Sequence, residues 1–196
     1  MQLLLIRHAL PVRAESPDGS PVDPGLSEEG FQQARWLAQS LRAEPIEALY
    51  TSPMRRARET AQALSAELGL DARVDADLVE LDHQSDVYVP LEELKASDYP
   101  RWQALVQEGG LYADVDLPAF RRQVTRSMER IIAAHPGQHV AVTCHGGVIN
   151  AWTSHLLGVE ELFVFEPEYT GVSRFLAARS GERSLRTLNE SGHLRG

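Results

Sequence analysis

Two histidines, each at the end of a short apolar run, are the residues of this sequence best suited to chemistry. The run 3–6 leads directly to Arg7 and His8, and the run 140–144 leads to His145, which two glycines follow. Short runs of this kind are typical of buried strands, and open α/β sheets bind their ligands at the carboxyl ends of their strands. Two histidines at such an edge, one of them beside an arginine, indicate covalent phosphoryl transfer through a histidine.

A cluster of arginines after the predicted strand 46–51 offers positive charge for a phosphate group. A guanidinium group stays charged and can donate hydrogen bonds to two phosphate oxygens at once. In Arg55-Arg56-Ala57-Arg58, helical geometry turns Arg55 and Arg58 to other faces than Arg56. Arg56 is also close to the predicted start of its helix, where free N–H groups favour an anion. The alternative is that Arg56 is one of three solvated helix charges.

The composition is that of an ordinary globular protein and limits the possible partners. The chain has 196 residues, a net charge of -9 and one cysteine, Cys144. The negative charge disfavours nucleic acid and anionic membranes as partners, but a local basic site can still bind a small anion. All apolar runs are shorter than the roughly 20 residues that span a bilayer, and the first one has no basic leader. A single cysteine cannot form a disulfide within the chain, which fits a reducing compartment. We therefore expect a cytoplasmic protein.

The first half of the chain alternates between predicted strands and helices. A strand over 2–7 is followed by a Pro- and Gly-rich loop and by Ser27, the expected N-cap of a helix with two glutamates in its first turn. After the strand 46–51, Ser52 is the expected N-cap of a second helix, with Pro53 at its first position. The inward faces of these two helices are predicted to carry Phe31, Ala34, Leu37, Ala38 and Leu41, and Ala57, Thr60, Ala61, Leu64 and Leu68.

The second half begins irregularly and then continues the alternation. A short strand is expected within 73–80, no long period runs through 82–100, and a helix is expected over 100–108. Clearer patterns predict a helix over 117–135, a strand over 139–145, a helix over 147–157, and a hairpin of 173–178 with 184–189. We therefore expect one α/β domain over 1–196: a three-layer sandwich with a mostly parallel central sheet and helices on both faces.

Three separated motifs resemble, in order, the signature of the histidine phosphatase superfamily, which includes phosphoglycerate mutases and many small-molecule phosphatases. The motifs are Arg7-His8, the segment 52–61, and His145-Gly146-Gly147. The segments 23–30 and 189–194 also resemble parts of those proteins, so the resemblance covers nearly the whole chain.

The resemblance implies a role for each motif residue. His8 is the nucleophile that forms a phosphohistidine, and Arg7, Arg56 and His145 surround the phosphate group. Gly146 and Gly147 let the chain turn into a helix close to the anion. Because these side chains supply the positive charge, no metal or other cofactor is expected, and the partner is a small phosphorylated substrate.

The sequence departs from the family pattern in two places. Glu80 is the expected general acid, but the segment 82–88 lacks the usual glycine-and-aromatic pattern, so Asp82 is a competing candidate. A further alternative is that Glu80 is a structural carboxylate paired with an arginine. The residues 9–11 read Ala-Leu-Pro where many members have Gly-Glu-Thr, and Arg13 is a candidate compensating contact to the phosphate or to the substrate.

The fate of the phosphohistidine decides between two enzymatic functions. The chain is compact, and the region 82–116 does not resemble the segments that enclose the substrate in mutases. We therefore expect a phosphomonoesterase acting on a small metabolite. The alternatives are a cofactor-dependent mutase-type phosphotransferase and a non-catalytic phosphate-binding domain. The sequence leaves the substrate and the oligomeric state open.

Overall fold

A mixed sheet forms the centre of the molecule, in a computed structural model that describes residues 1–107 and 115–195. Its strands lie in the order β4-β3-β6-β1-β7-β8. They are β1 (Gln2–Arg7), β3 (Ala48–Thr51), β4 (Ala72–Val74), β6 (His139–Cys144), β7 (Val172–Ala177) and β8 (Arg183–Glu190). β4, β3, β6 and β1 run parallel, whereas β7 and β8 form an antiparallel hairpin at one edge. The predicted α/β fold with a mostly parallel sheet is confirmed.

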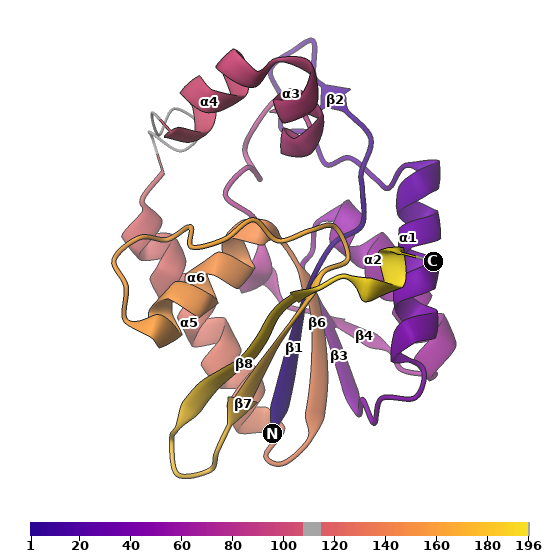
Figure 1. Ribbon diagram of the computed structural model, residues 1–196, viewed down its shortest axis with the longest axis vertical. Coiled ribbons are helices and arrows are strands. Elements are labelled where there is room, and N and C mark those ends of the chain that lie inside the picture. The colour runs from indigo at the N-terminus through magenta and orange to yellow at the C-terminus, as the bar shows by residue number, and fades with distance from the viewer. Residues whose placement is uncertain (108–114, 196) are drawn as a thin grey trace.

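Helices cover both faces of this sheet (Figure 1). α1 (Glu28–Leu41) and α2 (Arg55–Leu68) pack together on one face, and α5 (Leu117–Ala134) and α6 (Gly146–Leu157) pack together on the other. β1 contributes side chains to the apolar layers on both faces of the sheet, because successive side chains of a strand point in opposite directions. Leu3 and Leu5 join the apolar cluster under α5 and α6, and Leu4 and Ile6 join the cluster under α1 and α2. All four side chains are fully buried.

The strand order brings distant segments of the chain to one edge of the sheet. β6 lies between β1 and β3, so the carboxyl ends of all three strands are neighbours. The hydrogen-bond ladder continues past the strand ends: the His8 amide donates to the Cys144 carbonyl at 2.9 Å, and the Ser52 amide donates to the Thr143 carbonyl at 3.0 Å. His8, Ser52 and His145 therefore emerge side by side.

Two local predictions for the first two helices are wrong. Ser52 is not the N-cap of α2, which begins at Arg55 with Met54 as its cap. Phe31 is not on the inward face of α1, because its side chain is 41% exposed. A Cβ on Gly30 would lie 2.0 Å from the Leu10 carbonyl oxygen. The helix thus approaches the preceding loop so closely that only glycine fits inward, and Phe31, the next residue, turns outward.

The middle of the chain is more structured than the sequence indicates. β2 (Ala14–Glu15) pairs with β5 (Val87–Tyr88) in a separate two-stranded sheet, and two short helices follow, α3 (Leu91–Ser97) and α4 (Tyr99–Gln107). Figure 1 shows α3 and α4 above the edge of the main sheet at which the parallel strands end. The expected helix over 100–108 corresponds to α4, although residue 108 lies outside the described residues. The expected strand within 73–80 is shorter, because 3₁₀ helix η1 (Ala76–Leu78) follows β4.

The later elements agree with the sequence apart from their ends. α5 ends at Ala134 with His135 as its cap, and β6 ends at Cys144, so His145 is the N-cap of α6. A final 3₁₀ helix, η3 (Gly192–Leu194), packs against α1. In the part of the chain that the structure describes, no helix is both long and apolar enough to cross a membrane.

The hydroxyl of Thr60 connects α2 to the segment that follows β1 by a hydrogen bond, and the contribution of this bond to stability can be tested. This buried hydroxyl accepts a hydrogen bond from the Ala9 amide at 3.0 Å and donates to the Arg56 carbonyl. We expect Thr60→Val to lower the free energy of unfolding by about 1–3 kcal/mol, because the Ala9 amide loses its partner. The matched control is Thr125→Val, whose buried hydroxyl has no partner among the described residues. Chemical denaturation that gave equal losses for both variants would contradict this account.

Candidate active site

His8 is buried, and its surroundings fix the state of its ring. The side chain is 3% exposed. Nδ1 lies 2.9 Å from the carbonyl oxygen of Ala9, so Nδ1 carries the proton and Nε2 carries the lone pair. Burial lowers the pKa of His8 well below its usual value, and Arg56 and Arg7 lower it further. The imidazole is therefore neutral, with Nε2 available as a nucleophile.

Arg56 lies directly against that nucleophile. Its Nε donates toward His8 Nε2 at 3.3 Å, and its Nη2 donates to the Asp82 carboxylate at 2.7 Å and 3.1 Å. The ring of Tyr88 lies 4.8 Å from the guanidinium carbon. The side chain is 1% exposed, which excludes the alternative of a solvated helix charge. Arg56 is thus a fixed positive charge at His8.

His145 faces His8 from the end of β6, with 5.1 Å between the two ring centroids. Its Nε2 is 2.8 Å from the hydroxyl of Ser52. Burial lowers the pKa of His145, and Arg56 and His8 contribute to the same effect, so this ring is also neutral. From the sequence, Ser52 is expected as a helix cap and as the first residue of the motif 52–61, without a role at the site. The signal that could have identified it is its place at the carboxyl end of a parallel strand, the same place that His8 and His145 occupy.

Arg7 completes the positively charged side of the site. Its guanidinium carbon lies 3.8 Å from the centre of the Tyr169 ring, which itself lies 5.7 Å from the His8 ring. Nη1 donates to the carboxylate of Glu92 and, at 2.6 Å, to the carbonyl of Pro167. Neither Tyr169 nor Glu92 was expected from the sequence, because both contacts join segments far apart in the chain and follow no local pattern.

Three buried nitrogens of these side chains have no hydrogen-bond partner among the described residues. They are Arg7 Nε, Arg56 Nη1 and His145 Nδ1. Buried polar groups in folded proteins are nearly always paired, and exceptions call for an explanation. Here the three atoms belong to the side chains that surround His8, and an oxyanion is the kind of ligand that would pair with N–H donors of this sort.

Glu80 lies beside the start of α6 and is 8% exposed. Oε2 accepts from the Gly147 amide at 2.8 Å, and Oε1 accepts from the Leu81 amide at 2.9 Å. Burial, reinforced by the charge of Asp82, raises the pKa of Glu80 to about 7. The competing candidate, Asp82, is more exposed and its carboxylate is held by Arg56. The two carboxylates therefore have different surroundings: Glu80 is buried and accepts from two backbone amides, whereas Asp82 pairs with Arg56.

Two other expected site residues, Arg13 and Gly146, lie in less crowded surroundings. Arg13 is 62% exposed and pairs with Glu93 of α3 at 3.0 Å, so it contacts the helix above the site. Gly146 is the first residue of α6, and a Cβ there would meet nothing within 4 Å. The close approach occurs at Gly147, where a Cβ would lie 2.2 Å from Glu80 Oε1.

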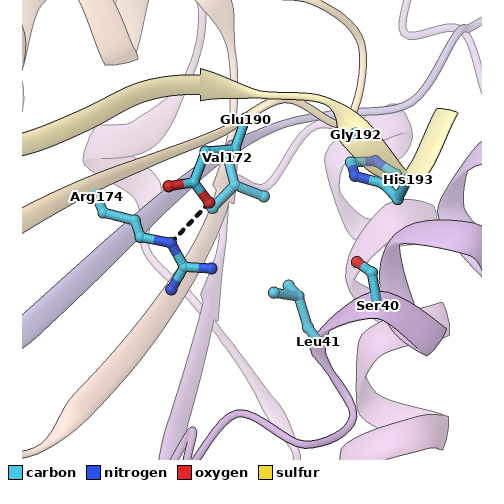
Figure 2. A pocket seen from close by; sticks show the side chains of 7 residues that line it. All are labelled: Ser40, Leu41, Val172, Arg174, Glu190, Gly192 and His193. Atoms are coloured by element: carbon cyan, nitrogen blue, oxygen red, sulfur yellow. Dashed lines mark hydrogen bonds and ion pairs between the residues drawn. The ribbon is translucent and has the colours of Figure 1, made fainter. Parts of the chain in front are cut away.

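A surface cavity of about 290 Å³ lies away from these residues (Figure 2). It is lined by Ser40, Leu41, Val172, Arg174, Glu190, Gly192 and His193. Arg174 is already paired with Glu44 at 3.0 Å and with Glu190 at 2.8 Å. Because these carboxylates neutralise the guanidinium, the cavity is poorly suited to an anion, and we do not assign it to the site.

Comparison with known proteins agrees with the motifs and the geometry. The model of the histidine phosphatase superfamily (branch 1) matches residues 3–191. Phosphoserine phosphatase 1 of Hydrogenobacter thermophilus is 28% identical over 82% of this chain and 78% of its own. Phosphoglycerate mutase-like protein 4 of Arabidopsis thaliana is 30% identical over 76% of this chain and 68% of its own. A phosphoserine phosphatase mutant from Entamoeba histolytica, solved with phosphoserine, has the same fold, with a TM-score of 0.74, 20% identity and 98% of each chain covered.

The chain belongs to the histidine phosphatase superfamily. This confirms the resemblance drawn from the three sequence motifs, over nearly the whole chain.

The close approach of α6 to Glu80 gives a prediction with a matched control in the adjacent residue. Gly147→Ala places a methyl group 2.2 Å from Glu80 Oε1, and we expect it to lower the free energy of unfolding by about 1–3 kcal/mol, as overpacking does. Gly146→Ala meets no atom within 4 Å and should leave the free energy of unfolding within about 0.5 kcal/mol of the wild type. Equal stability of both variants in urea would show that the Glu80 carboxylate is not held where we describe it.

Proposed function

We propose that the protein is a phosphomonoesterase that transfers the phosphoryl group of a small phosphorylated metabolite to His8 and then to water. The observation that carries the proposal is the set of three buried nitrogens without a partner among the described residues, Arg7 Nε, Arg56 Nη1 and His145 Nδ1. They surround a histidine whose Nε2 carries the lone pair and accepts a hydrogen bond from Arg56 Nε at 3.3 Å. A phosphate group would pair with these donors. Family membership and the phosphatases among the similar proteins support the same chemistry.

In the first step, His8 Nε2 attacks phosphorus and the bond from phosphorus to the ester oxygen breaks. The negative charge of the transferring group is spread over its equatorial oxygens, so catalysis depends on fixed positive charge and hydrogen-bond donors. Arg7, Arg56 and His145 supply them. We assign the general acid to Glu80, which gives its proton to the leaving alcohol, because its pKa of about 7 keeps a large share of it protonated near neutral pH.

In the second step, water attacks the phosphohistidine. The Glu80 carboxylate takes a proton from the water, the bond from phosphorus to Nε2 breaks, and neutral His8 and inorganic phosphate result. Asp82 has a different task in this scheme: through its two contacts with Nη2 it orients Arg56.

The test of this function is a single-turnover assay of the wild type and His8→Ala. Substrates are p-nitrophenyl phosphate and a panel of phosphometabolites that includes 3-phosphoglycerate with and without a bisphosphorylated primer. We expect the wild type to release inorganic phosphate without a primer and His8→Ala to release none above background. Primer-dependent isomerisation without release would indicate a mutase, and equal activity of both proteins would exclude the phosphohistidine.

The assignment of Glu80 predicts a distinct dependence on pH and on the leaving group. Because the acid acts in its protonated form, kcat/KM for alkyl phosphates should fall as pH rises through about 7, the pKa of Glu80 in the free enzyme. His8 contributes no change in this range, since its pKa is well below its usual value and the ring is already neutral.

Paired variants separate the two carboxylates. Glu80→Gln should lower kcat/KM for alkyl phosphates by about 10²-fold or more and remove the pH dependence. Its effect on p-nitrophenyl phosphate should be much smaller, because that phenolate leaves without a proton. Asp82→Asn should affect both substrates alike. The reverse pattern would make Asp82 the acid.

A further inference from the structure

The hydroxyl of Ser52 is buried between two hydrogen-bonding groups just after β3. The residue is 0% exposed. Its Oγ accepts a hydrogen bond from the Met54 amide at 3.3 Å and lies 2.8 Å from Nε2 of His145. A serine hydroxyl has one proton to donate and two lone pairs that accept. Because the Met54 amide can only donate, Nε2 of His145 is the acceptor that the described residues offer to the Ser52 proton.

The neutral ring of His145 can carry its proton on either nitrogen, and the two forms satisfy this contact differently. With the proton on Nδ1, Nε2 accepts from the Ser52 hydroxyl, and both groups are paired. With the proton on Nε2, that nitrogen donates to Ser52 Oγ, and the buried serine proton has no acceptor among the described residues. A buried donor without a partner costs free energy. The contact with Ser52 therefore favours the form with the proton on Nδ1.

The position of this proton decides whether His145 can bind a phosphate group. Nδ1 is buried and has no partner among the described residues, and the His145 ring faces the His8 ring with 5.1 Å between their centroids. Phosphate oxygens are strong hydrogen-bond acceptors, so a protonated Nδ1 donates to them, whereas a lone pair at Nδ1 repels them. Since burial lowers the pKa of His145 well below its usual value, the ring does not carry both protons at neutral pH.

We propose that Ser52 is a positioning residue that holds the proton of His145 on Nδ1, so that the ring meets the phosphate group as a hydrogen-bond donor. In this scheme Ser52 acts through His145, and no covalent bond and no proton transfer is assigned to its hydroxyl. The proposal rests on the phosphomonoesterase function given above, because it concerns a donor to the phosphate group of that reaction.

The proton position can be measured in the ligand-free protein, without turnover. In a nitrogen NMR spectrum of protein labelled at its histidine rings, protonated and unprotonated nitrogens resonate in well-separated regions, and His145→Gln identifies the signals of this ring by removing them. We expect the proton on Nδ1 in the wild type. Ser52→Ala should move a large share of it to Nε2, because the hydroxyl that favours Nδ1 is gone.

Two further variants separate the hydroxyl from a general effect on the core. Ser127→Ala makes the same change at a second fully buried serine, whose hydroxyl donates to Asp75 at 2.7 Å, and it should leave the His145 signals unchanged. Ser52→Thr keeps the hydroxyl and should keep the proton on Nδ1. A wild-type ring with its proton on Nε2, or an unchanged proton position in Ser52→Ala, overturns the proposal. The wild-type spectrum alone can contradict it, whatever the stability of Ser52→Ala.

Phosphate affinity and turnover measure the consequence for the site. We expect Ser52→Ala to raise the dissociation constant of inorganic phosphate about tenfold in calorimetry and to lower kcat/KM for p-nitrophenyl phosphate by about 10²-fold. The Ser127→Ala control should stay within about twofold of the wild type in both measurements.

These measurements also separate the proposal from the proposed function. If the proton position and the phosphate affinity change as expected while no protein in the series releases phosphate, the role of Ser52 at His145 is supported and the phosphomonoesterase function fails alone. If the wild type releases phosphate and Ser52→Ala has the same kcat/KM and the same phosphate affinity, the proposal is overturned and the function stands.

Discussion

β6 lies between β1 and β3, and main-chain hydrogen bonds hold the ends of these three strands side by side. The bond from the His8 amide to the Cys144 carbonyl and the bond from Ser52 to Thr143 extend the ladder just beyond the strands. Everything at the site depends on this pairing, because His8, Ser52 and His145 come from positions 8, 52 and 145 of the chain. The helices that follow β3 and β6 start at the same edge, so Arg56 and the Glu80-binding amide of Gly147 arrive there as well.

Burial sets the charge states of the groups gathered at this edge, and neighbouring charges add to its effect on the pKa values of the two histidines. Removal from water keeps both histidines neutral and raises the pKa of Glu80, whereas the two arginines remain charged. Each arginine is balanced by one carboxylate and one aromatic ring: Asp82 and Tyr88 at Arg56, and Glu92 and Tyr169 at Arg7. A buried charge requires partners of this kind. In the proposed mechanism, this arrangement leaves the neutral histidines to act as nucleophile and donor, and the charged arginines bind the phosphate group.

The sequence predicts those parts of the structure that have a periodic or motif signal. The parallel strands, the four large helices and the grouping of Arg7, His8, Arg56 and His145 all follow from apolar runs, helical spacing and strand ends. The outward turn of Phe31 does not, since it depends on the approach of Gly30 to Leu10. The contacts of Glu92 and Arg13 also could not be predicted, because they join residues 85 and 80 positions apart and α3 has only 7 residues. Such contacts are products of the assembled fold.

The way α3 is attached gives the protein a sensitivity that its catalytic centre lacks. Two of the three ion pairs of α3 are exposed on both sides, with side-chain exposures of 62% and 46% for Arg13 and Glu93, and 41% and 74% for Lys95 and Glu166. Dissolved salt screens exposed charges over distances of about 10 Å at 0.1 M but screens buried pairs much less. Arg56, at 1% exposure, belongs to the second kind. Ionic strength therefore weakens the ion pairs that attach α3 to the rest of the protein, whereas the buried guanidinium of Arg56 is screened much less.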